Sequence, residues 1–148
     1  MGPRIRRTSK RAIAVAATLM VAAGLTVVGA PSAVAAERAS FDLSYGATYY
    51  RGTIDFYDRS VTITGELRGL STGCRKGQAY AFRTVTGGTL DRGTTSTVCN
   101  GPVSRQIPLT ADVAGGAAMV QVSLLPAGEE RLLAYCFVKR GEEFCHLD

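Results

Sequence analysis

The sequence predicts an all-β protein: an immunoglobulin-like β-sandwich of about eight short antiparallel strands, braced by disulfides. Three observations support this prediction. Apolar and polar residues alternate with a period of two through most of the chain after residue 36, which is typical of strands with one buried face. Glycine, proline and aspartate separate these short runs, as turns require. Four cysteines lie in the same part of the chain.

The first 36 residues have the pattern of a secretory signal peptide. A basic stretch is followed by an uncharged, mainly apolar run over residues 12–30, then by Pro31 and small residues that end in Ala35-Ala36. Basic, apolar and small-residue regions in this order indicate an export signal. We expect cleavage between Ala36 and Glu37, with the bond between Ala35 and Ala36 as the alternative.

A retained membrane anchor is the competing interpretation, because the apolar run has about the length of a membrane span. Its Ala- and Gly-rich composition and the proline directly after it favour cleavage. We therefore expect residues 1–36 to be removed, no stable membrane anchor to remain, and residues 37–148 to form one secreted, extracellular domain.

Cleavage changes the charge balance. Five of the 17 Lys and Arg residues precede residue 37, whereas all 12 Asp and Glu residues follow it. The remaining 12 basic side chains balance the 12 acidic ones. A nucleic-acid-binding function inferred from the basic composition is therefore not supported.

The clearest pair of strands flanks residues 58–59. Both runs alternate apolar and polar residues. A turn at these two residues sets Phe56 opposite Val61 and Ile54 opposite Ile63. All four side chains then share one face, so the register is self-consistent.

The other runs follow the same logic. Tyr80, Phe82 and Thr84 share one face of their strand. Pro108 places its own strand at a sheet edge or lies at the end of that strand, because proline cannot donate to a ladder. Residues 110–116 have room for a single helical turn. The remaining expected strands cover residues 40–45, 78–86, 94–99, 104–109, 117–125, 131–139 and 142–147.

An even number of cysteines in an exported chain predicts disulfides. We favour Cys74 with Cys99 and Cys136 with Cys145, because each pair then closes a local hairpin-like segment. The loop-entropy model gives about 3.5 kcal/mol for the longer loop and about 2.7 kcal/mol for the shorter one. A structural zinc site is the rival interpretation, but the spacings lack the close ligand pairs of such sites, so no metal is expected.

The C-terminal run predicts a specific hairpin. With a turn at Arg140-Gly141, Cys136 falls directly opposite Cys145. In this register the two cysteines form a non-hydrogen-bonded pair. The Cα atoms of such a pair are about 4.5 Å apart, which is within disulfide range. A three-residue loop would set Cys136 against Phe144 instead, and the disulfide disfavours that register.

No catalytic residue is assigned. Ser–His–Asp and Cys–His sites need a histidine, and the only one, His146, lies two residues from the end. Oxidised cysteines are not nucleophiles. A small hydrolase of the glycosidase kind would need paired carboxylates. The candidates occupy predicted outward-facing strand positions or turns: Asp42, Asp55, Asp58, Glu66 and Asp91. No phosphate-binding, dinucleotide-binding or metal-binding motif is present, so no cofactor is expected.

Tyrosines and arginines cluster in the first third of the mature chain. Exposed Tyr and Arg side chains are typical anchors of binding interfaces, and flat aromatic rings also suit sugar rings. The competing interpretation is that about half of these tyrosines fill the core of a domain without tryptophan. The candidate binding residues are Tyr45, Tyr49, Tyr50, Arg51, Tyr57 and Arg59.

Three segments resemble small secreted β-sandwich proteins of actinobacteria that have no assigned activity: GTIDFYDRSVTITGELRG, CRKGQAYAFRTVTGGTLDRGTTSTVC and IPLTADVAGGAAMVQVSL. The resemblance implies export and a β fold, and no activity. Subtilisin-inhibitor proteins have a similar size and two disulfides, but their cysteine-proline segment is missing, because none of the four cysteines here precedes a proline.

The sequence thus favours a secreted, non-catalytic domain that binds an extracellular polysaccharide or protein. The alternatives are an inhibitor of an extracellular enzyme, since disulfide-braced loops suit that role, and a small hydrolase.

Overall fold

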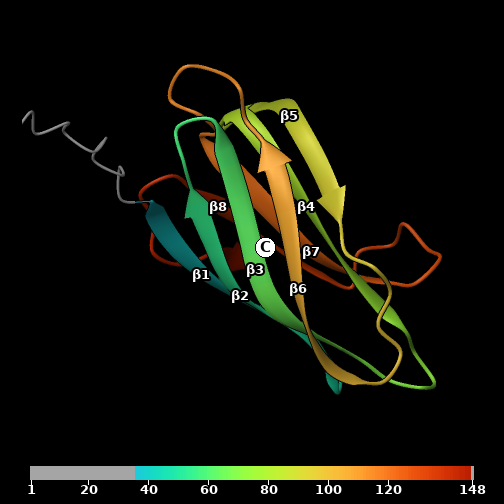
Figure 1. The fold of residues 1–148 in the computed structure, drawn as a ribbon. Helices are drawn as coiled ribbons and strands as arrows, with labels where there is room; N and C mark the ends of the chain where they lie inside the picture. The colour runs from blue at the N-terminus through green and yellow to red at the C-terminus, as the bar shows by residue number, and fades with distance from the viewer. Residues whose placement is uncertain (1–35, 148) are drawn as a thin grey trace, which may run out of the picture. The chain divides into compact units, whose positions relative to one another are not determined.

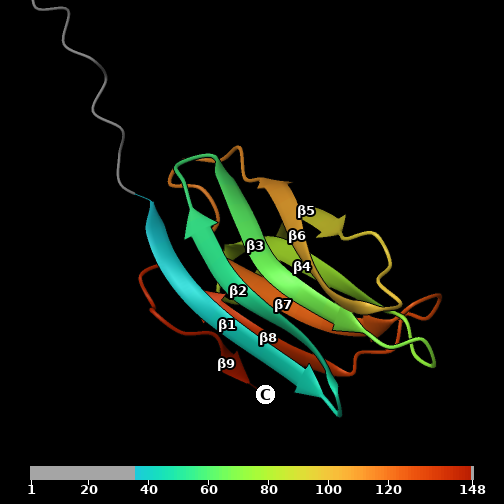
Figure 2. The same ribbon diagram turned by 60° about the horizontal axis from the view of Figure 1, so that its bottom comes forward.

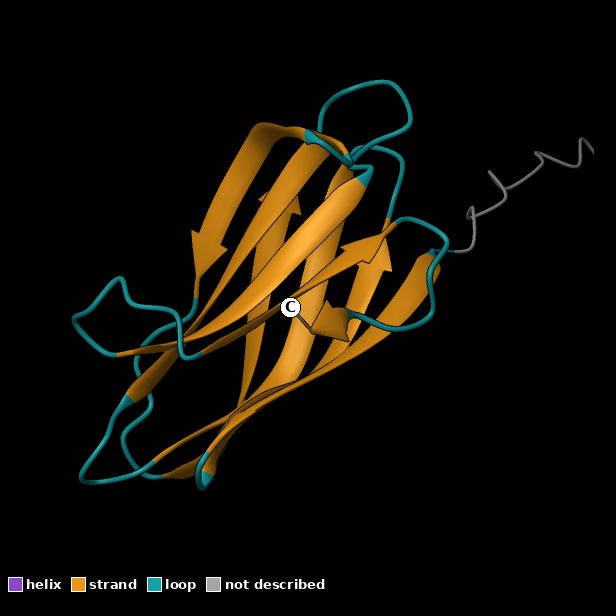
Figure 3. Ribbon diagram, turned by 180° about the vertical axis from the view of Figure 1, so that it is seen from behind, coloured by secondary structure: helices purple, strands orange, loops and turns teal. Residues whose placement is uncertain are grey.

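The computed structural model describes residues 36–147, which form two antiparallel β-sheets. The predicted signal peptide lies outside the described residues. Within the described range, no helix has the length and hydropathy needed to span a membrane. Figure 3 shows strands joined only by loops and turns over this part of the chain.

The two sheets pack face to face, with the core between them (Figure 1). The first sheet has four strands in the order β1-β2-β3-β6, namely β1 (Glu37–Tyr45), β2 (Thr48–Phe56), β3 (Ser60–Gly69) and β6 (Gly101–Thr110). The second has five strands in the order β5-β4-β7-β8-β9, namely β5 (Gly87–Thr94), β4 (Arg75–Thr84), β7 (Met119–Pro126), β8 (Ala134–Lys139) and β9 (His146–Leu147). The predicted all-β sandwich is confirmed, and the described part of the chain has nine strands.

The predicted register of the β2–β3 hairpin is confirmed. Phe56 lies opposite Val61 and Ile54 opposite Ile63, and all four side chains are buried. Pro108 lies in β6, which is an edge strand, as expected. Alternation in sequence determined this register because a slip of one residue would turn the apolar side chains of one of the two strands to the solvent face.

The predicted strand over residues 94–99 is wrong. At the sheet edge β4 pairs with β5, which ends at Thr94. Beyond it, the Thr95 hydroxyl accepts a hydrogen bond from the Gly77 N–H at 2.9 Å, so a side chain replaces a ladder contact. Val98 then makes an isolated bridge to Arg75. The helical turn considered for residues 110–116 is also absent: Thr110 ends β6, and residues 111–116 form a loop.

The core contains no tryptophan, and aromatic and aliphatic side chains fill it together. The Tyr50 ring is fully buried and meets the Phe41 ring edge to face, with centroids 4.9 Å apart. Gly77 makes this possible, because a Cβ atom there would lie 2.6 Å from the Tyr50 ring. Burial raises the pKa of Tyr50, and its hydroxyl has no hydrogen-bond partner.

Both predicted disulfides are present. Cys74 is joined to Cys99 and Cys136 to Cys145, and none of the four cysteines is free. The first bridge ties the start of β4 to the loop after β5. The second ties β8 to the C-terminal segment. Two disulfides fit an extracellular protein.

The register predicted for the C-terminal hairpin is wrong, although the disulfide is correct. Cys136 lies opposite Leu147, not opposite Cys145, and the two disulfide-bonded Cα atoms are 5.6 Å apart. The cause is tertiary: residues 143–145 leave the hairpin and pair with Ser40 in β1 of the other sheet. The chain returns to β8 only at His146.

Candidate binding sites

The predicted Tyr and Arg cluster is divided among four places in the fold. Tyr50 lies in the core, so it is withdrawn as a binding residue. Its neighbours in β2 point the other way because side chains alternate along a strand. The remaining five residues lie on the outer face of the first sheet or at the two ends of the sandwich.

Tyr49 and Arg51 lie on the outer face of the first sheet, where they bind each other and Glu66. The Tyr49 hydroxyl donates to the Glu66 carboxylate at 2.5 Å, and the Arg51 guanidinium lies over the Tyr49 ring, 3.9 Å from its centroid. These contacts hold the pKa of Glu66 below its usual value, the Tyr49 hydrogen bond being the main cause. The three side chains thus contact one another on the outer face, away from the cleft described next.

Tyr57 and Arg59 lie at one end of the sandwich, in and beside the loop that follows β2. Tyr57 is 42% exposed, and Arg59 forms an ion pair with Asp112. Tyr45 lies at the other end, just before the turn into β2, and is 47% exposed. The two exposed tyrosines therefore belong to different surfaces.

Tyr45 lines a cleft of about 430 Å³. Its walls are the β1–β2 turn, the turn between β3 and β4, and the loop between β7 and β8. The last two meet at the Cys74 carbonyl, which accepts a hydrogen bond from the Ala127 N–H at 3.0 Å. Because the disulfide to Cys99 holds Cys74, this covalent bond restrains two walls of the cleft.

A chain of hydrogen bonds connects Tyr45 to an arginine in the cleft. The Arg75 Nε atom donates to the Thr48 hydroxyl at 3.1 Å, and that hydroxyl donates to the Tyr45 carbonyl at 2.7 Å. A second Arg75 nitrogen donates to the Cys74 carbonyl at 3.1 Å. Arg75 is thus held in place in the cleft that the Tyr45 ring also lines.

The cleft also contains paired charges and small hydroxyls. Glu129 and Arg131 form an ion pair at 3.4 Å, and both side chains are more than half exposed. Ser71 and Thr72 form the exposed tip of the turn between β3 and β4. An exposed ring beside guanidinium, carboxylate and hydroxyl groups offers one apolar surface and several hydrogen-bonding groups.

Sequence reasoning missed the aromatic surface of the second sheet. Tyr80 and Phe82 in β4 stack with centroids 6.2 Å apart, and Tyr135 and Phe137 in β8 meet edge to face at 5.9 Å. Gln121 of β7 lies between them, opposite both Tyr80 and Phe137. Alternation had already placed Tyr80 and Phe82 on one face, but no local pattern relates them to β8. All four rings are half-buried, because each packs on its neighbour.

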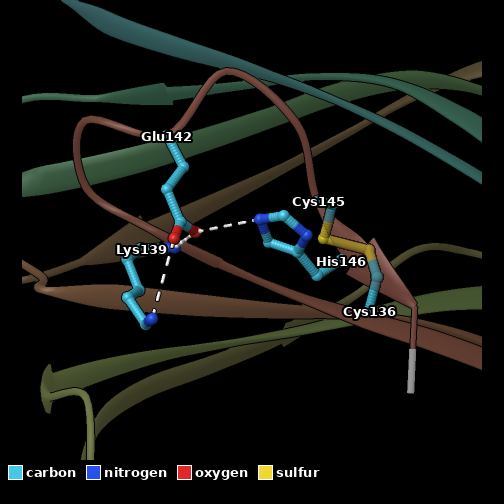
Figure 4. A network of polar contacts seen from close by, with 5 residues as sticks. All are labelled: Cys136, Lys139, Glu142, Cys145 and His146. Atoms are coloured by element: carbon cyan, nitrogen blue, oxygen red, sulfur yellow. Dashed lines mark hydrogen bonds and ion pairs between the residues drawn. A yellow bond between two sulfur atoms is a disulfide. The ribbon is translucent and has the colours of Figure 1, made fainter.

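His146 lies in an exposed polar network beside the second disulfide (Figure 4). Glu142 accepts a hydrogen bond from the Lys139 backbone N–H at 2.7 Å, and its carboxylate is 3.7 Å from His146 Nε2. The Lys139 hydrogen bond is the main cause that lowers the pKa of Glu142. The network links the turn after β8 to β9. No group of three or more metal-ligating side chains occurs among residues 36–147.

These features define a class: a two-disulfide β-sandwich with a loop-lined cleft at one end. No protein-family model, curated protein or solved structure matches the chain.

Proposed function

We propose that this is an exported, non-catalytic binding domain that holds a segment of extracellular polysaccharide in the cleft at Tyr45. The observation that supports this most is that the exposed Tyr45 ring shares the cleft with an Arg75 side chain held by two hydrogen-bonding neighbours, Thr48 and Cys74. A sugar ring has apolar C–H faces that pack on an aromatic ring, and its hydroxyls need fixed donors and acceptors. The cleft offers both kinds of contact.

The walls of the cleft support binding by a preformed site. Two of them are joined through Cys74, so little ordering of loops is needed when a ligand binds. A preformed site loses less conformational entropy on binding. The leader pattern and the two disulfides support an extracellular location for the ligand.

The test is co-sedimentation of the oxidised protein with insoluble polysaccharides, namely cellulose, chitin and bacterial cell-wall glycan, followed by titration with soluble fragments of any that binds. We expect Tyr45→Ala to weaken binding by about tenfold or more. Tyr57→Ala is the matched control, because Tyr57 has a similar exposure at the opposite end.

Two results would refute the proposal. One is the absence of binding to every polysaccharide tested. The other is binding that survives Tyr45→Ala but is lost with Phe137→Ala, which would move the site to the aromatic surface of the second sheet.

A second candidate function is inhibition of an extracellular enzyme. The loop after β5 favours it, because Ser96 and Thr97 are exposed between two buried residues, Thr95 and Val98. The Cys74–Cys99 disulfide closes the same loop. A loop held at both ends resists distortion when an enzyme binds it. Inhibition assays with secreted proteases and glycosidases test this candidate, and loss of inhibition on changing Ser96 and Thr97 to alanine is the expected result.

A further inference from the structure

The β1 edge of the first sheet already accepts a short parallel strand from the end of the chain. The Ser40 N–H donates to the Glu143 carbonyl at 2.8 Å, and the Cys145 N–H donates to the Ser40 carbonyl at 2.9 Å. Phe144 is the residue that pairs with Ser40, in parallel orientation. Figure 2 shows the C-terminal strand β9 beside β1. The added segment covers only the first half of the edge.

The second half of the edge has no strand partner. After Cys145 the chain leaves β1, and His146 and Leu147 pair with β8 instead. Asp42 and Ser44 lie two and four residues beyond Ser40, so their N–H and C=O groups point in the same direction, away from β2. Within residues 36–147, no backbone hydrogen bond from another element reaches either residue.

A groove follows the unpaired half of the edge. Two depressions of about 300 and 500 Å³ meet there, and they share Asp42 and Leu147 as lining residues. Leu147 and Phe144 are the most exposed large apolar side chains of the described domain, at 67% and 65%, and Leu132 in the same groove is 39% exposed. Clustered apolar exposure of this kind marks an interaction surface.

The groove has a single charged lining residue among those described, and it is Asp42. Its carboxylate accepts a hydrogen bond from the Ser44 hydroxyl at 3.2 Å. Arg51, its cross-strand neighbour, is directed to Glu66. A ligand that lies along the edge therefore meets one negative charge surrounded by apolar side chains.

We propose that the edge at Asp42 and Ser44 binds an extended peptide segment of a partner protein by strand addition. The bound segment continues in the direction that residues 143–145 begin, parallel to β1. It has apolar side chains at alternate positions, against Leu132 and Leu147, and a lysine or arginine facing Asp42. The backbone groups of the edge provide affinity, and the apolar groove and Asp42 provide specificity. This function is separate from the polysaccharide cleft.

The other edge of the same sheet is protected against strand addition. β6 contains Pro102 and Pro108, which have no N–H to donate. Its final N–H, at Thr110, donates to the Asp91 carboxylate at 2.7 Å. In β1, by contrast, the corresponding groups at Asp42 and Ser44 stay available. The β6 edge is therefore protected at three of its outward-facing positions, whereas the β1 edge has no such protection at Asp42 and Ser44.

The probe is a synthetic seven-residue peptide of alternating valine and lysine, titrated by fluorescence anisotropy against the full oxidised protein. We expect saturable binding, with chemical-shift changes centred on the Asp42 and Ser44 amides. The same peptide with N-methyl groups on the edge-facing amides keeps its side chains but loses its donors, so we expect binding to weaken by about tenfold or more. A valine-glutamate peptide should bind worst, because it faces Asp42 with like charge.

Two variants test the edge directly. Ser44→Pro removes one outward N–H without breaking the β1–β2 ladder and should weaken binding of the valine-lysine peptide. Ser104→Pro makes the same change at the blocked β6 edge and should leave it unchanged. Asp42→Lys should reverse the preference toward the valine-glutamate peptide.

Three results would overturn the proposal. The first is equal binding of the normal and N-methylated peptides, which would show that the backbone does not pair. The second is no binding of any peptide to correctly folded protein. The third is a doubling of molecular mass in solution that Ser44→Pro abolishes, because a second copy of this chain would then occupy the edge.

Discussion

Cys136 lies opposite Leu147 in the β8–β9 ladder, whereas its disulfide joins it to Cys145, two residues earlier in the chain. The offset exists because residues 143–145 pair with Ser40 of β1 before the chain returns to β8. The disulfide therefore secures a contact between the two sheets as well as the end of a hairpin.

Removing this disulfide should loosen the contact between the sheets. We expect the double variant Cys136→Ala, Cys145→Ala to lose about 2.7 kcal/mol of unfolding free energy, from loop entropy alone. The Ser40 amide should also exchange with solvent faster, since its acceptor is the Glu143 carbonyl. Urea unfolding and hydrogen exchange measure the two effects.

The control is the double variant Cys74→Ala, Cys99→Ala. It should lose about 3.5 kcal/mol and leave the protection of Ser40 unchanged. Unchanged exchange at Ser40 in the first variant would show that the contact between the sheets does not depend on Cys136–Cys145.

Tyr50 should tolerate loss of its hydroxyl but not loss of its ring. The hydroxyl is buried without a hydrogen-bond partner, and such a group costs about 1–3 kcal/mol. Tyr50→Phe should therefore leave the free energy of unfolding unchanged or raise it. Tyr50→Ala removes a fully buried ring and should cost about 3–5 kcal/mol. Thermal or urea unfolding decides this, and a marked loss of stability in Tyr50→Phe would mean that the hydroxyl has a partner after all.

Glu142 should stabilise the fold in a pH-dependent manner. Its pKa is lowered in the folded state, mainly by the Lys139 N–H and also by the charge of Lys139. A carboxylate whose folded pKa is lowered adds stability above its unfolded pKa, and that stability is lost as the pH falls through the folded pKa. We therefore expect Glu142→Gln to lower stability at about pH 7 and to cost progressively less as the pH falls below about 4.

Glu143→Gln is the matched control, because Glu143 is the next residue and its side chain is exposed. It should have no effect on stability at either pH. If Glu142→Gln were equally destabilising at both pH values, its carboxylate charge would not be the cause.

Export should remove the leader at a position that directly precedes the first strand. The small residues before Glu37 predict cleavage there or one residue earlier, and β1 begins at Glu37. N-terminal sequencing of secreted protein should begin at Glu37 or Ala36. Recovery of the protein from membranes with residues 12–30 intact would contradict this prediction and support an anchor.

The candidate cleft could be predicted only in part from the sequence. Tyr45 was singled out because it belongs to a cluster of tyrosines and arginines in the sequence, and it lines the cleft. Arg75, Glu129 and Arg131 were not singled out, because they come from segments 30 or more residues away, and no local spacing relates them to Tyr45. Tyr50 was a candidate binding residue, with burial in the core as the competing interpretation, and it lies in the core. Tyr50 is in phase with Ile54 and Phe56 on the buried face of its strand, but the alternation was not followed back beyond Gly52.

The sequence alone determined what depends on neighbouring residues: the β class, the β2–β3 register, and both disulfide pairings. Each follows from alternation with a period of two or from closure of a short loop, so the relevant residues lie within about 25 positions of one another. The tertiary structure decided the rest. Only packing of one sheet on the other could draw residues 143–145 out of their hairpin to Ser40. The same packing brings the loops of the cleft together and leaves the outer side of β1 at Asp42 and Ser44 unpaired among the described residues. Such contacts depend on where distant strands meet and not on any local pattern.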